Sequence, residues 1–493
     1  MAKDKIAVFL TKSAVALSIA FFVTFNAHSQ VRQTPNFILF IADDISAEDL
    51  GCYGHPVMKT PNIDRLAAEG LRFTSAYLTI SSCSPSRCSI ITGRYPHNTG
   101  APELHTNLPE GQVMFPEMLK NAGYFTILSG KNHMGPAVSK AFSKISNGRG
   151  PGREEDWAEL LRDRPKDKPF FCWYASIDAH REWTINSDAP VYKPEEVIIP
   201  PYLVDAPETR ADLTGYYHEV SRFDHYVGVI TEQLREEGVL DNTVIIVMAD
   251  NGRPFPRCKT RLYDSGIKTP FVMHAPAHLN PGVTDSLISS IDIAATVLEL
   301  AGVQKDERIQ GVSFVPLLKN HTATVRDVVF AEHNWHVYSN HERMVRAGDW
   351  LYIRNNMPDK QNLCGEAYIG GAGNDLWRLH QSGELNQAQS NIFWNPCPPE
   401  ELYHVCKDPH QLNNVAVIPE NQRILQNMRA LLNEWSKRTG DSIPGNPTPD
   451  RDAPPGAPPK DKKNFRHGEM PGESNNATQI NDPGVILLKG IKL

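Results

Sequence analysis

Four uncharged, strongly apolar runs restrict the fold of this chain more than any other feature. They span residues 36–42, 124–130, 169–177 and 243–249. Continuous apolar runs of this length predict strands that are buried on both faces, as in a parallel sheet. Helical patterns separate the runs, at 60–70, which opens with Thr-Pro and closes with Gly, and at 213–234, where apolar residues recur every three or four positions. This alternation predicts an α/β sandwich with a large, mostly parallel sheet between helices.

Each apolar run is followed by polar side chains that could bind a ligand. In chain order they are Asp43-Asp44, Lys131 with His133, Asp178 with His180, and Asp250-Asn251. Ligands of parallel sheets bind beyond the carboxyl ends of the strands, so we expect these side chains to meet at one edge of the sheet. Taken singly, each has an ordinary structural explanation as well, such as a turn for Asp250-Asn251-Gly252 or solvated surface for Lys131.

The length and the net charge of the chain limit its possible domain organisation and its possible partners. A formal net charge of −7 argues against nucleic acid or an anionic membrane surface as a partner, so an anionic substrate would need local basic residues. Because 493 residues exceed one ordinary core, we expect several parts. These are a catalytic domain at 30–325, a smaller subdomain at 326–440 with a short antiparallel sheet and an amphipathic helix over 421–440, and a Pro-rich tail at 441–493.

The first residues have the pattern of a secretory signal peptide. Lys3, Lys5 and Lys12 precede an uncharged apolar stretch, and Ala27 and Ser29 are small residues at the −3 and −1 positions of a cleavage site. The stretch is short for a membrane span of roughly 20 residues and holds no cysteine for a lipid anchor. We therefore expect residues 1–29 to be removed, leaving a periplasmic or secreted protein without stable membrane insertion.

Residues 83–94, CSPSRCSIITGR, combine a cysteine, a proline and an arginine at the start of a helical pattern. Pro85 and the helical character of 87–91 place Cys83 at a helix N-terminus, where partial positive charge and free N–H groups suit an anion. Arg87 lies one turn further on and can point back at the same anion. With the basic residues at the sheet edge, the motif predicts a site for a tetrahedral oxyanion such as sulfate or phosphate. Alone, it could also be an ordinary helix start with a buried thiol.

The extended motif resembles the signature of the formylglycine-dependent sulfatases, which belong to the alkaline phosphatase superfamily. Cys-x-Pro-Ser-Arg is followed by four residues and Thr-Gly-Arg, so every position of the signature is filled. The resemblance runs in order over about residues 35–440, and the stretch DNGRPFPRCKTRLY at 250–263 is most similar to the sulfamidase (N-sulfoglucosamine sulfohydrolase) branch. It implies an alkaline-phosphatase-like sandwich with a small C-terminal subdomain, and an enzyme that hydrolyses sulfate groups.

The resemblance also implies a nucleophile and a metal site. In the family the signature cysteine, here Cys83, is oxidised by a maturation enzyme to formylglycine (3-oxoalanine). One hydroxyl of the hydrated aldehyde attacks sulfur and the other expels sulfate, which divides the reaction into two easier halves. The implied metal ligands are Asp43, Asp44, Cys83, Asp250 and Asn251. Hard oxygen ligands of this kind suit Ca²⁺, with Mg²⁺ as the second candidate.

The remaining site residues are carried over position by position. Lys131 and Lys259 correspond to lysines that bind sulfate, His133 to a contact of the diol, and His180 to the acid that protonates the leaving group. His105 and His333 are candidates to line a sugar pocket, with loop or subdomain surface as the alternative. Two positions at the pocket rim depart from the family, because Asn132 replaces a tryptophan and Ala179 replaces a proline.

Several functions remain open at this point. The favoured one is hydrolysis of sulfate from a sulfated polysaccharide or oligosaccharide, and the first alternative is a sulfamidase acting on heparan-type glycans. A phosphatase or phosphodiesterase of the same superfamily would use a serine or threonine nucleophile and two zinc ions, and the cysteine at position 83 argues against it. A glycan-binding protein without activity would result if Cys83 were not converted.

Overall fold

A computed structural model describes residues 34–361, 363–364, 370–453, 460, 462 and 465–488. The predicted signal peptide at 1–29 lies outside these residues. From Thr34 onward the chain packs as one compact unit, which contains both the predicted catalytic domain and the predicted subdomain. Within the ranges given, no helix combines the length and the apolar character needed to cross a bilayer.

The large sheet has eight strands and is mostly parallel. Their order is β5 (Lys144–Ser146), β4 (Phe125–Gly130), β6 (Phe170–Ala175), β1 (Asn36–Ala42), β7 (Thr243–Ala249), β8 (Phe271–His274), β2 (Leu71–Phe73) and β9 (Gly282–Thr284). Neighbours from β5 to β7 run parallel, whereas β8 is antiparallel to both β7 and β2. The four apolar runs form β1, β4, β6 and β7, and every residue of β1 and β7 is buried, as predicted for the centre of such a sheet.

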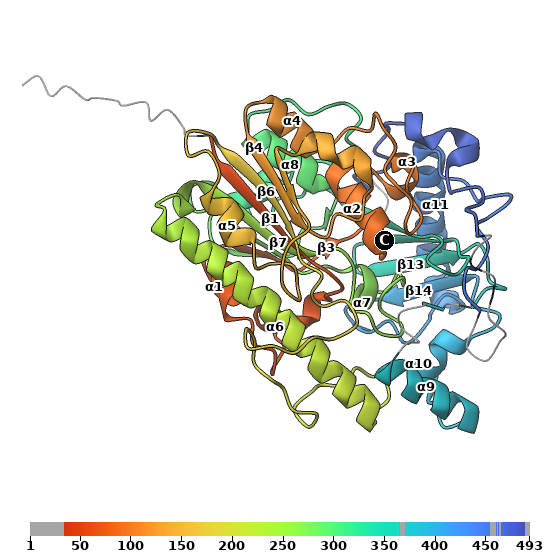
Figure 1. Ribbon diagram of the computed structural model, residues 1–493. Helices are drawn as coiled ribbons and strands as arrows, with labels where there is room; N and C mark the ends of the chain where they lie inside the picture. The colour runs from red at the N-terminus through yellow and green to blue at the C-terminus, as the bar shows by residue number, and fades with distance from the viewer. Residues whose placement is uncertain are drawn as a thin grey trace, which may run out of the picture. The chain divides into compact units, whose positions relative to one another are not determined.

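Helices cover both faces of this sheet, and successive residues of each central strand point into different cores. Along β1, Phe37, Leu39 and Ile41 enter one core, and Ile38 and Phe40 enter the other. The first core is closed mainly by α2 (Cys83–Thr92), α4 (Phe115–Asn121) and α8 (Asp292–Leu300), and the second by α1 (Pro61–Glu69), α5 (Trp157–Arg162) and α6 (Pro207–Glu236) (Figure 1). The period of two along a pleated strand therefore produces the sandwich.

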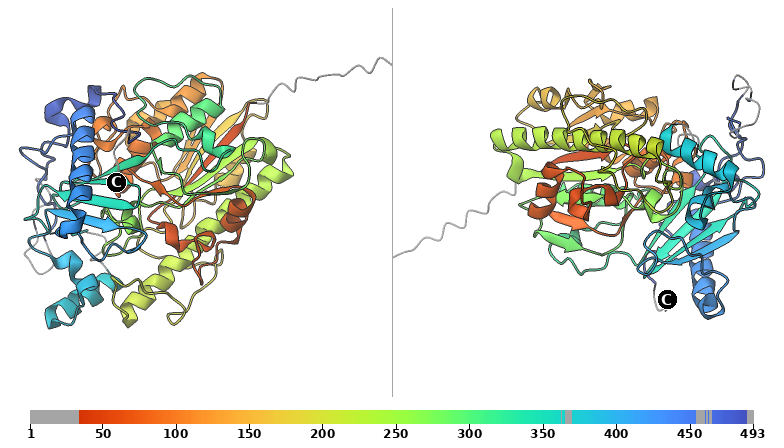
Figure 2. Two further views of the ribbon diagram at one scale, coloured as in Figure 1. Left: turned by 180° about the vertical axis from the view of Figure 1, so that it is seen from behind. Right: turned by 90° about the horizontal axis from the view of Figure 1, so that it is seen from below.

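A second, antiparallel sheet follows in the C-terminal third, as predicted. It consists of β11 (Val328–His333), β12 (Glu342–Ala347), β13 (Trp350–Asn355) and β14 (Glu400–His404). The stretch 344–355 supplies two strands because Gly348, with φ of 53°, turns the chain between them. The amphipathic helix α11 (Gln422–Thr439) packs against this sheet (Figure 2). The ring of Trp435 stacks on Phe330, and Met428 belongs to the same apolar cluster.

Shorter elements connect these layers. They are β3 (Ala76–Tyr77) and β10 (Ile288–Ser289), which pair with each other, and the helices α3 (Pro96–Thr99), α7 (Asp264–Ile267), α9 (Gly371–Ser382) and α10 (Gln387–Ser390). Short 3₁₀ helices occur at Ala47–Asp49, Gly51–Tyr53, Pro136–Ala141, Leu240–Asn242, Val315–Leu318, Asn391–Phe393, Pro419–Asn421, Glu473–Asn475 and Ala477–Gln479. Helix α9 packs against the long helix α6.

Arg94, the last residue of the signature, ties the C-terminal segment to the catalytic part of the chain. Its guanidinium is fully buried and donates to the carbonyl oxygens of Asn98, Arg308, Thr478 and Ile480 and to Oδ1 of Asn481. Burial lowers the pKa of Arg94 to about 10, which leaves it charged at neutral pH. This arginine thus stabilises the fold by holding residues 478–481 beside the end of α2.

Replacing Arg94 by alanine is expected to lower the free energy of unfolding by about 3 kcal/mol, because buried acceptors lose a charged donor. Chemical denaturation would show the loss as a lower midpoint, and limited proteolysis would show earlier cleavage in the C-terminal segment. Arg235→Ala is the control, since this half-exposed arginine pairs with Glu232 of its own helix and should contribute no more than about 0.5 kcal/mol. Equal midpoints for the two variants would contradict the assigned role.

Candidate active site

The ends of four central strands bring the predicted site residues together. Asp43 and Asp44 follow β1, Lys131 follows β4, His180 follows β6, and Asp250 with Asn251 follows β7. Cys83 is the first residue of α2, as predicted, and its Sγ lies 3.9 Å from Oδ1 of Asp44. Ligand atoms of Asp43, Asp44 and Cys83 all lie within 4.8 Å of one another. The candidate site therefore lies at this edge of the parallel sheet.

Two hydrogen bonds fix the backbone on either side of Cys83. The Oγ of Ser82 lies 2.7 Å from Nδ1 of His336, and the Oγ of Ser84 accepts the backbone N–H of His105 at 2.8 Å. All residues of α2 are buried, and Cys83 itself is 1% exposed. Burial raises the pKa of the Cys83 thiol well above its ordinary value. The helix start is thus held rigidly inside the protein.

Arg87 links α2 to the acidic residues of the sheet edge. Its Nε donates to Oδ2 of Asp250 at 2.7 Å, a second nitrogen lies 2.7 Å from the same oxygen, and a third donates to the carbonyl of Lys131 at 3.0 Å. Both charged side chains are fully buried. The arginine thus holds Asp250 in place and lies 3.8 Å from Oδ1 of Asp43.

Each of the two predicted lysines pairs with one of the two aspartates that follow β1. Lys131 Nζ donates to Oδ2 of Asp43 and keeps 13% of its side chain exposed, whereas Lys259 Nζ is fully buried and donates to Oδ2 of Asp44 at 2.8 Å. Burial opposes ionisation of Asp43, but the positive charges around it, Lys131 foremost, hold its pKa below the usual range. With Arg87 and Asp250, the cluster contains three carboxyl groups and three cationic groups, so full ionisation leaves it neutral.

The oxygen atoms of this cluster fit a divalent cation. Among the described residues, Oδ1 of Asp43 and Oδ1 of Asn251 are buried without a hydrogen-bond donor. The amide nitrogen of Asn251 donates to Oδ1 of Asp44 at 2.6 Å, which orients its oxygen away from that carboxylate. Unsatisfied buried oxygens are costly, and a hard cation such as Ca²⁺ would satisfy them. Asp43, Asp44, Asp250 and Asn251 are accordingly the residues that could hold it.

Three of the four predicted histidines lie beside the cluster. The rings of His105 and His133 are 5.0 Å apart, and both residues have positive φ, of 64° and 53°. Burial, with the charges of Lys131 and Arg87, lowers the pKa of His133 to about 2, so its ring is neutral. His105 is exposed. His180 lines the cavity described below, and its Nδ1 lies 2.6 Å from the carbonyl of Arg181.

His333 lies at the end of β11, and the cavity described below does not include it. It is 3% exposed, and its Nδ1 lies 2.8 Å from Oε2 of Glu342, which also pairs with Arg261. Burial lowers the pKa of His333. This placement gives no support to the predicted sugar contact.

A cavity of about 290 Å³ opens beside the cluster. Its lining comprises Asp43, Lys131, Pro151, Arg153, Ile177, Asp178, His180, Arg181, Glu182, Thr184 and Glu219. Sequence reasoning did not single out Arg153, Arg181, Glu182 or Glu219. For Arg153 a signal existed, because the glycine-rich stretch NGRGPGR at 147–153 predicts a tight surface loop.

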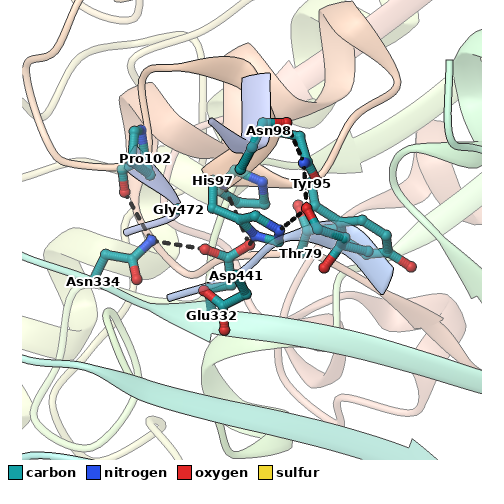
Figure 3. Close-up of polar contacts among 12 residues, drawn as sticks. Thr79, Tyr95, His97, Asn98, Pro102, Glu332, Asn334, Asp441 and Gly472 are labelled. Atoms are coloured by element: carbon teal, nitrogen blue, oxygen red, sulfur yellow. Dashed lines mark hydrogen bonds and ion pairs between the residues drawn. The ribbon is translucent and has the colours of Figure 1, made fainter. Parts of the chain in front are cut away.

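A second buried cluster, separate from the residues that line this cavity, joins the two parts of the fold (Figure 3). His97 Nδ1 lies 2.7 Å from Oε1 of Glu332, and Asn334 donates to Oε2 of the same glutamate at 2.9 Å. A carboxylate oxygen of Asp441 lies within 4.8 Å of the ligand atoms of His97 and Glu332. Arg343 holds this carboxylate, because its nitrogens donate to the two oxygens of Asp441 at 2.7 and 2.8 Å. The guanidinium supplies the positive charge that these acids need, so the cluster stabilises the junction of α3, β11 and the end of α11.

The matches to known families agree with this geometry. The chain matches the family described as Sulfatase over residues 35–152 and 154–303, and it therefore belongs to the sulfatase family and is a sulfuric ester hydrolase. Residues 258–353 further match the family described as N-sulphoglucosamine sulphohydrolase, C-terminal. The predicted resemblance is confirmed, and the second family match begins inside the sulfamidase-like stretch at 250–263.

Individual relatives extend over most of the chain. An ulvan-active sulfatase of Formosa agariphila is 29% identical, covering 84% of this chain and 76% of the relative, and human N-sulphoglucosamine sulphohydrolase is 28% identical, covering 82% and 90%. A solved structure of a protein in complex with its substrate D-glucosamine-2-N,6-O-disulfate superposes with a TM-score of 0.62 at 20% identity, covering 82% of this chain and 98% of that protein. This confirms the predicted sulfatase fold.

Proposed function

We propose that the protein removes sulfate groups from a sulfated polysaccharide or oligosaccharide during glycan catabolism, in the periplasm or outside the cell. The observation that carries the proposal is Cys83 at the start of a buried helix, beside a cluster of three acids and three bases that borders a cavity. Relatives named as ulvan-active sulfatase, N-sulphoglucosamine sulphohydrolase and N-acetylglucosamine-6-O-sulfatase support a glycan substrate. The predicted signal peptide supports the location.

The proposed reaction assigns the nucleophile to Cys83 after its conversion to formylglycine by a maturation enzyme. The hydrated aldehyde supplies one hydroxyl that attacks sulfur and another that expels sulfate. A Ca²⁺ or Mg²⁺ ion held by Asp43, Asp44, Asp250 and Asn251 would supply positive charge for a sulfate oxygen. Lys131, whose ammonium group reaches the cavity, binds the sulfate from the open side. Lys259 is fully buried, and it holds Asp44 while offering its remaining protons to the same anion.

His180 is proposed as the acid for the leaving group. Its Nδ1 lies 2.6 Å from the carbonyl oxygen of Arg181, and because a carbonyl only accepts, Nδ1 carries a proton. The proton delivered to the leaving oxygen or nitrogen must then come from Nε2 of the imidazolium. His133, neutral and half-buried, keeps its proposed role as a contact of the nucleophile. His105, exposed beside His133, keeps its proposed role as a contact of the sugar.

A sulfamidase that acts on N-sulfoglucosamine is the second candidate. The match of residues 258–353 and the 90% coverage of the human enzyme favour it. A phosphatase with two zinc ions is disfavoured, because the group of metal-ligating side chains found at this site among the described residues contains no histidine.

Release of inorganic sulfate from a panel of glycans tests the proposal. The panel contains O-sulfated polysaccharides, their oligosaccharides, N-sulfoglucosamine and a phosphate ester, each incubated with protein whose Cys83 has been converted. Release from an O-sulfated glycan supports the first candidate, and release from N-sulfoglucosamine alone supports the second. Phosphate release without sulfate release would contradict both.

Lys131→Gln is expected to lower kcat/KM for sulfate release by about 10²-fold, the loss typical of one donor to a developing anion. The neutral amide cannot balance the charge of Asp43 or of the sulfate. Lys166→Gln is the matched control, because this exposed lysine pairs with Glu237 away from the site and should leave the kinetics unchanged. Steady-state kinetics on the best substrate of the panel measure both variants, and equal values would remove Lys131 from the site.

A further inference from the structure

Arg153 is a charged residue of the cavity lining whose charge is not balanced within the described part of the chain. It lines the cavity together with Lys131 and His180, and its side chain is exposed. No ion pair joins it to a described carboxylate, although exposed arginines nearby do form such pairs, as Arg149 does with Glu159. Its guanidinium is therefore available to a ligand in the cavity.

Most other charged side chains of the lining are already engaged. Arg181 donates to both oxygens of Asp212, at 2.5 and 2.7 Å, and Asp178 accepts from Arg222 at 2.6 and 2.7 Å. Glu219 lies 3.2 Å from the same Arg222. Burial, with the charge of Asp178, raises the pKa of Glu219 to about 8, so this wall carries little net negative charge at neutral pH. Of the lining acids and arginines in the described chain, Arg153 and the exposed Glu182 are left without an ion pair.

The loop that carries Arg153 is fixed on both sides of it. The carbonyl of Gly152 accepts from the backbone N–H of Ile177 at 3.0 Å and from the hydroxyl of Ser176 at 3.1 Å, and Ser176 also bonds the carboxyl of Glu154. Arg153 itself has φ of 65°, a conformation that a non-glycine residue keeps only where its surroundings enforce it. Because residues 176–177 lead directly to His180, the fold sets where Arg153 stands relative to the reaction.

We propose that Arg153 binds a second oxyanion of the substrate, either a carboxylate or another sulfate, so that the enzyme prefers saccharides with two anionic groups. This inference rests on the proposed function and deepens it. A guanidinium presents parallel N–H donors that match the paired oxygens of a carboxylate or a sulfate. A cavity of about 290 Å³ is near the lower limit for small-molecule sites, so the second anion must lie on the sulfated sugar or on the unit next to it.

Matched substrate pairs test the proposal. Glucosamine 6-sulfate is compared with glucosamine N,6-disulfate, and with the same 6-sulfate linked to a uronic acid, for the wild type and for Arg153→Gln. The ratio of kcat/KM for the dianionic over the monosulfated substrate is expected to fall about 10- to 100-fold in the variant, the loss typical of a charged hydrogen bond. The pair that shows the fall identifies the second anion as a sulfate or as a carboxylate.

Two controls separate recognition from structural damage. Arg149→Gln changes an arginine of the same loop that pairs with Glu159, and it should leave both substrates unaffected. Glu182→Gln removes a negative charge from the rim and should raise the ratio. In the wild type, KM for the dianionic substrate should also rise with ionic strength, and this rise should be smaller in Arg153→Gln.

The outcomes are distinct. A wild type that releases sulfate but shows no preference for two anions, or an Arg153→Gln variant that loses both substrates of a pair equally, overturns the role of Arg153 and leaves the proposed function standing. Failure of the wild type to release sulfate both from these substrates and from every member of the glycan panel above overturns the proposed function and this inference with it.

Discussion

Replacing Cys83 by alanine or by serine is expected to lower kcat for sulfate release by at least about 10⁴-fold, the loss typical of removing a nucleophile. Alanine cannot form the hydrated aldehyde. Serine offers one hydroxyl and would leave a sulfate ester that has no second hydroxyl to expel it. The fold should tolerate either change, because the side chain at 83 contributes little area to the large core and the helix is held through Ser82, Ser84 and Arg87.

Cys88→Ala is the matched control for these variants. Cys88 lies in the same helix, is fully buried in the apolar core, and burial raises its pKa to about 12, so it has no access to substrate. Its replacement should leave kcat unchanged and cost some stability through the small cavity it creates. A comparable loss of kcat in both cysteine variants would indicate damage to α2 and not loss of a nucleophile.

Mass spectrometry of the peptide that contains Cys83 completes this test. In active protein from its native host, the peptide is expected to be about 18 Da lighter than its thiol form, since the aldehyde oxygen replaces sulfur and its hydrogens. The fraction converted should be proportional to kcat across preparations. An active preparation in which Cys83 remains entirely a thiol would refute the formylglycine mechanism.

The convergence of the site could be predicted because it depends on a general property of parallel sheets. Four continuous apolar runs define four buried strands, and the residues that follow them must meet at one edge whatever the details of packing. The position of Cys83 at a helix start was equally local, since Pro85 and the residues after it define that start. It was thus possible to predict, without knowledge of tertiary contacts, that one sheet edge brings together Asp43, Lys131, His180 and Asp250.

What escaped prediction depends on contacts between distant segments. The engagement of Arg87 with Asp250 joins residues 163 positions apart. Arg153 enters the cavity because its loop bonds to residues 176–177, and Arg94 is structural because residues 478–481 return to it. His333 is covered because β11 pairs with β12 and places Glu342 beside it. No periodicity or local spacing reports such pairings, so a residue type alone cannot distinguish a ligand contact from a buried clamp.

Removal of divalent cations is expected to lower sulfate release by about 10³-fold and to lower the melting temperature as well. Without an ion, Oδ1 of Asp43 and Oδ1 of Asn251 lack a hydrogen-bond donor among the described residues, whereas the ion pairs of the surrounding side chains should keep the chain folded. Adding Ca²⁺ at about 100 times its dissociation constant should restore about 2.7 kcal/mol of stability. Activity and melting temperature should therefore recover over the same range of Ca²⁺ concentration.

Asn251→Ala tests whether this cluster is the site of the ion. The change removes a neutral oxygen ligand and the hydrogen bond to Asp44 without altering the charge of the cluster, so half-saturation by Ca²⁺ should require at least about tenfold more ion. Asn374→Ala, at an exposed asparagine that bonds Glu208, should not shift the curve. Melting curves measured against Ca²⁺ concentration give the comparison without depending on conversion of Cys83.

Full activity and an unchanged melting temperature in chelated protein that elemental analysis shows to be free of divalent metal would exclude a metal from the mechanism. The carboxylates would then serve only to balance Arg87, Lys131 and Lys259.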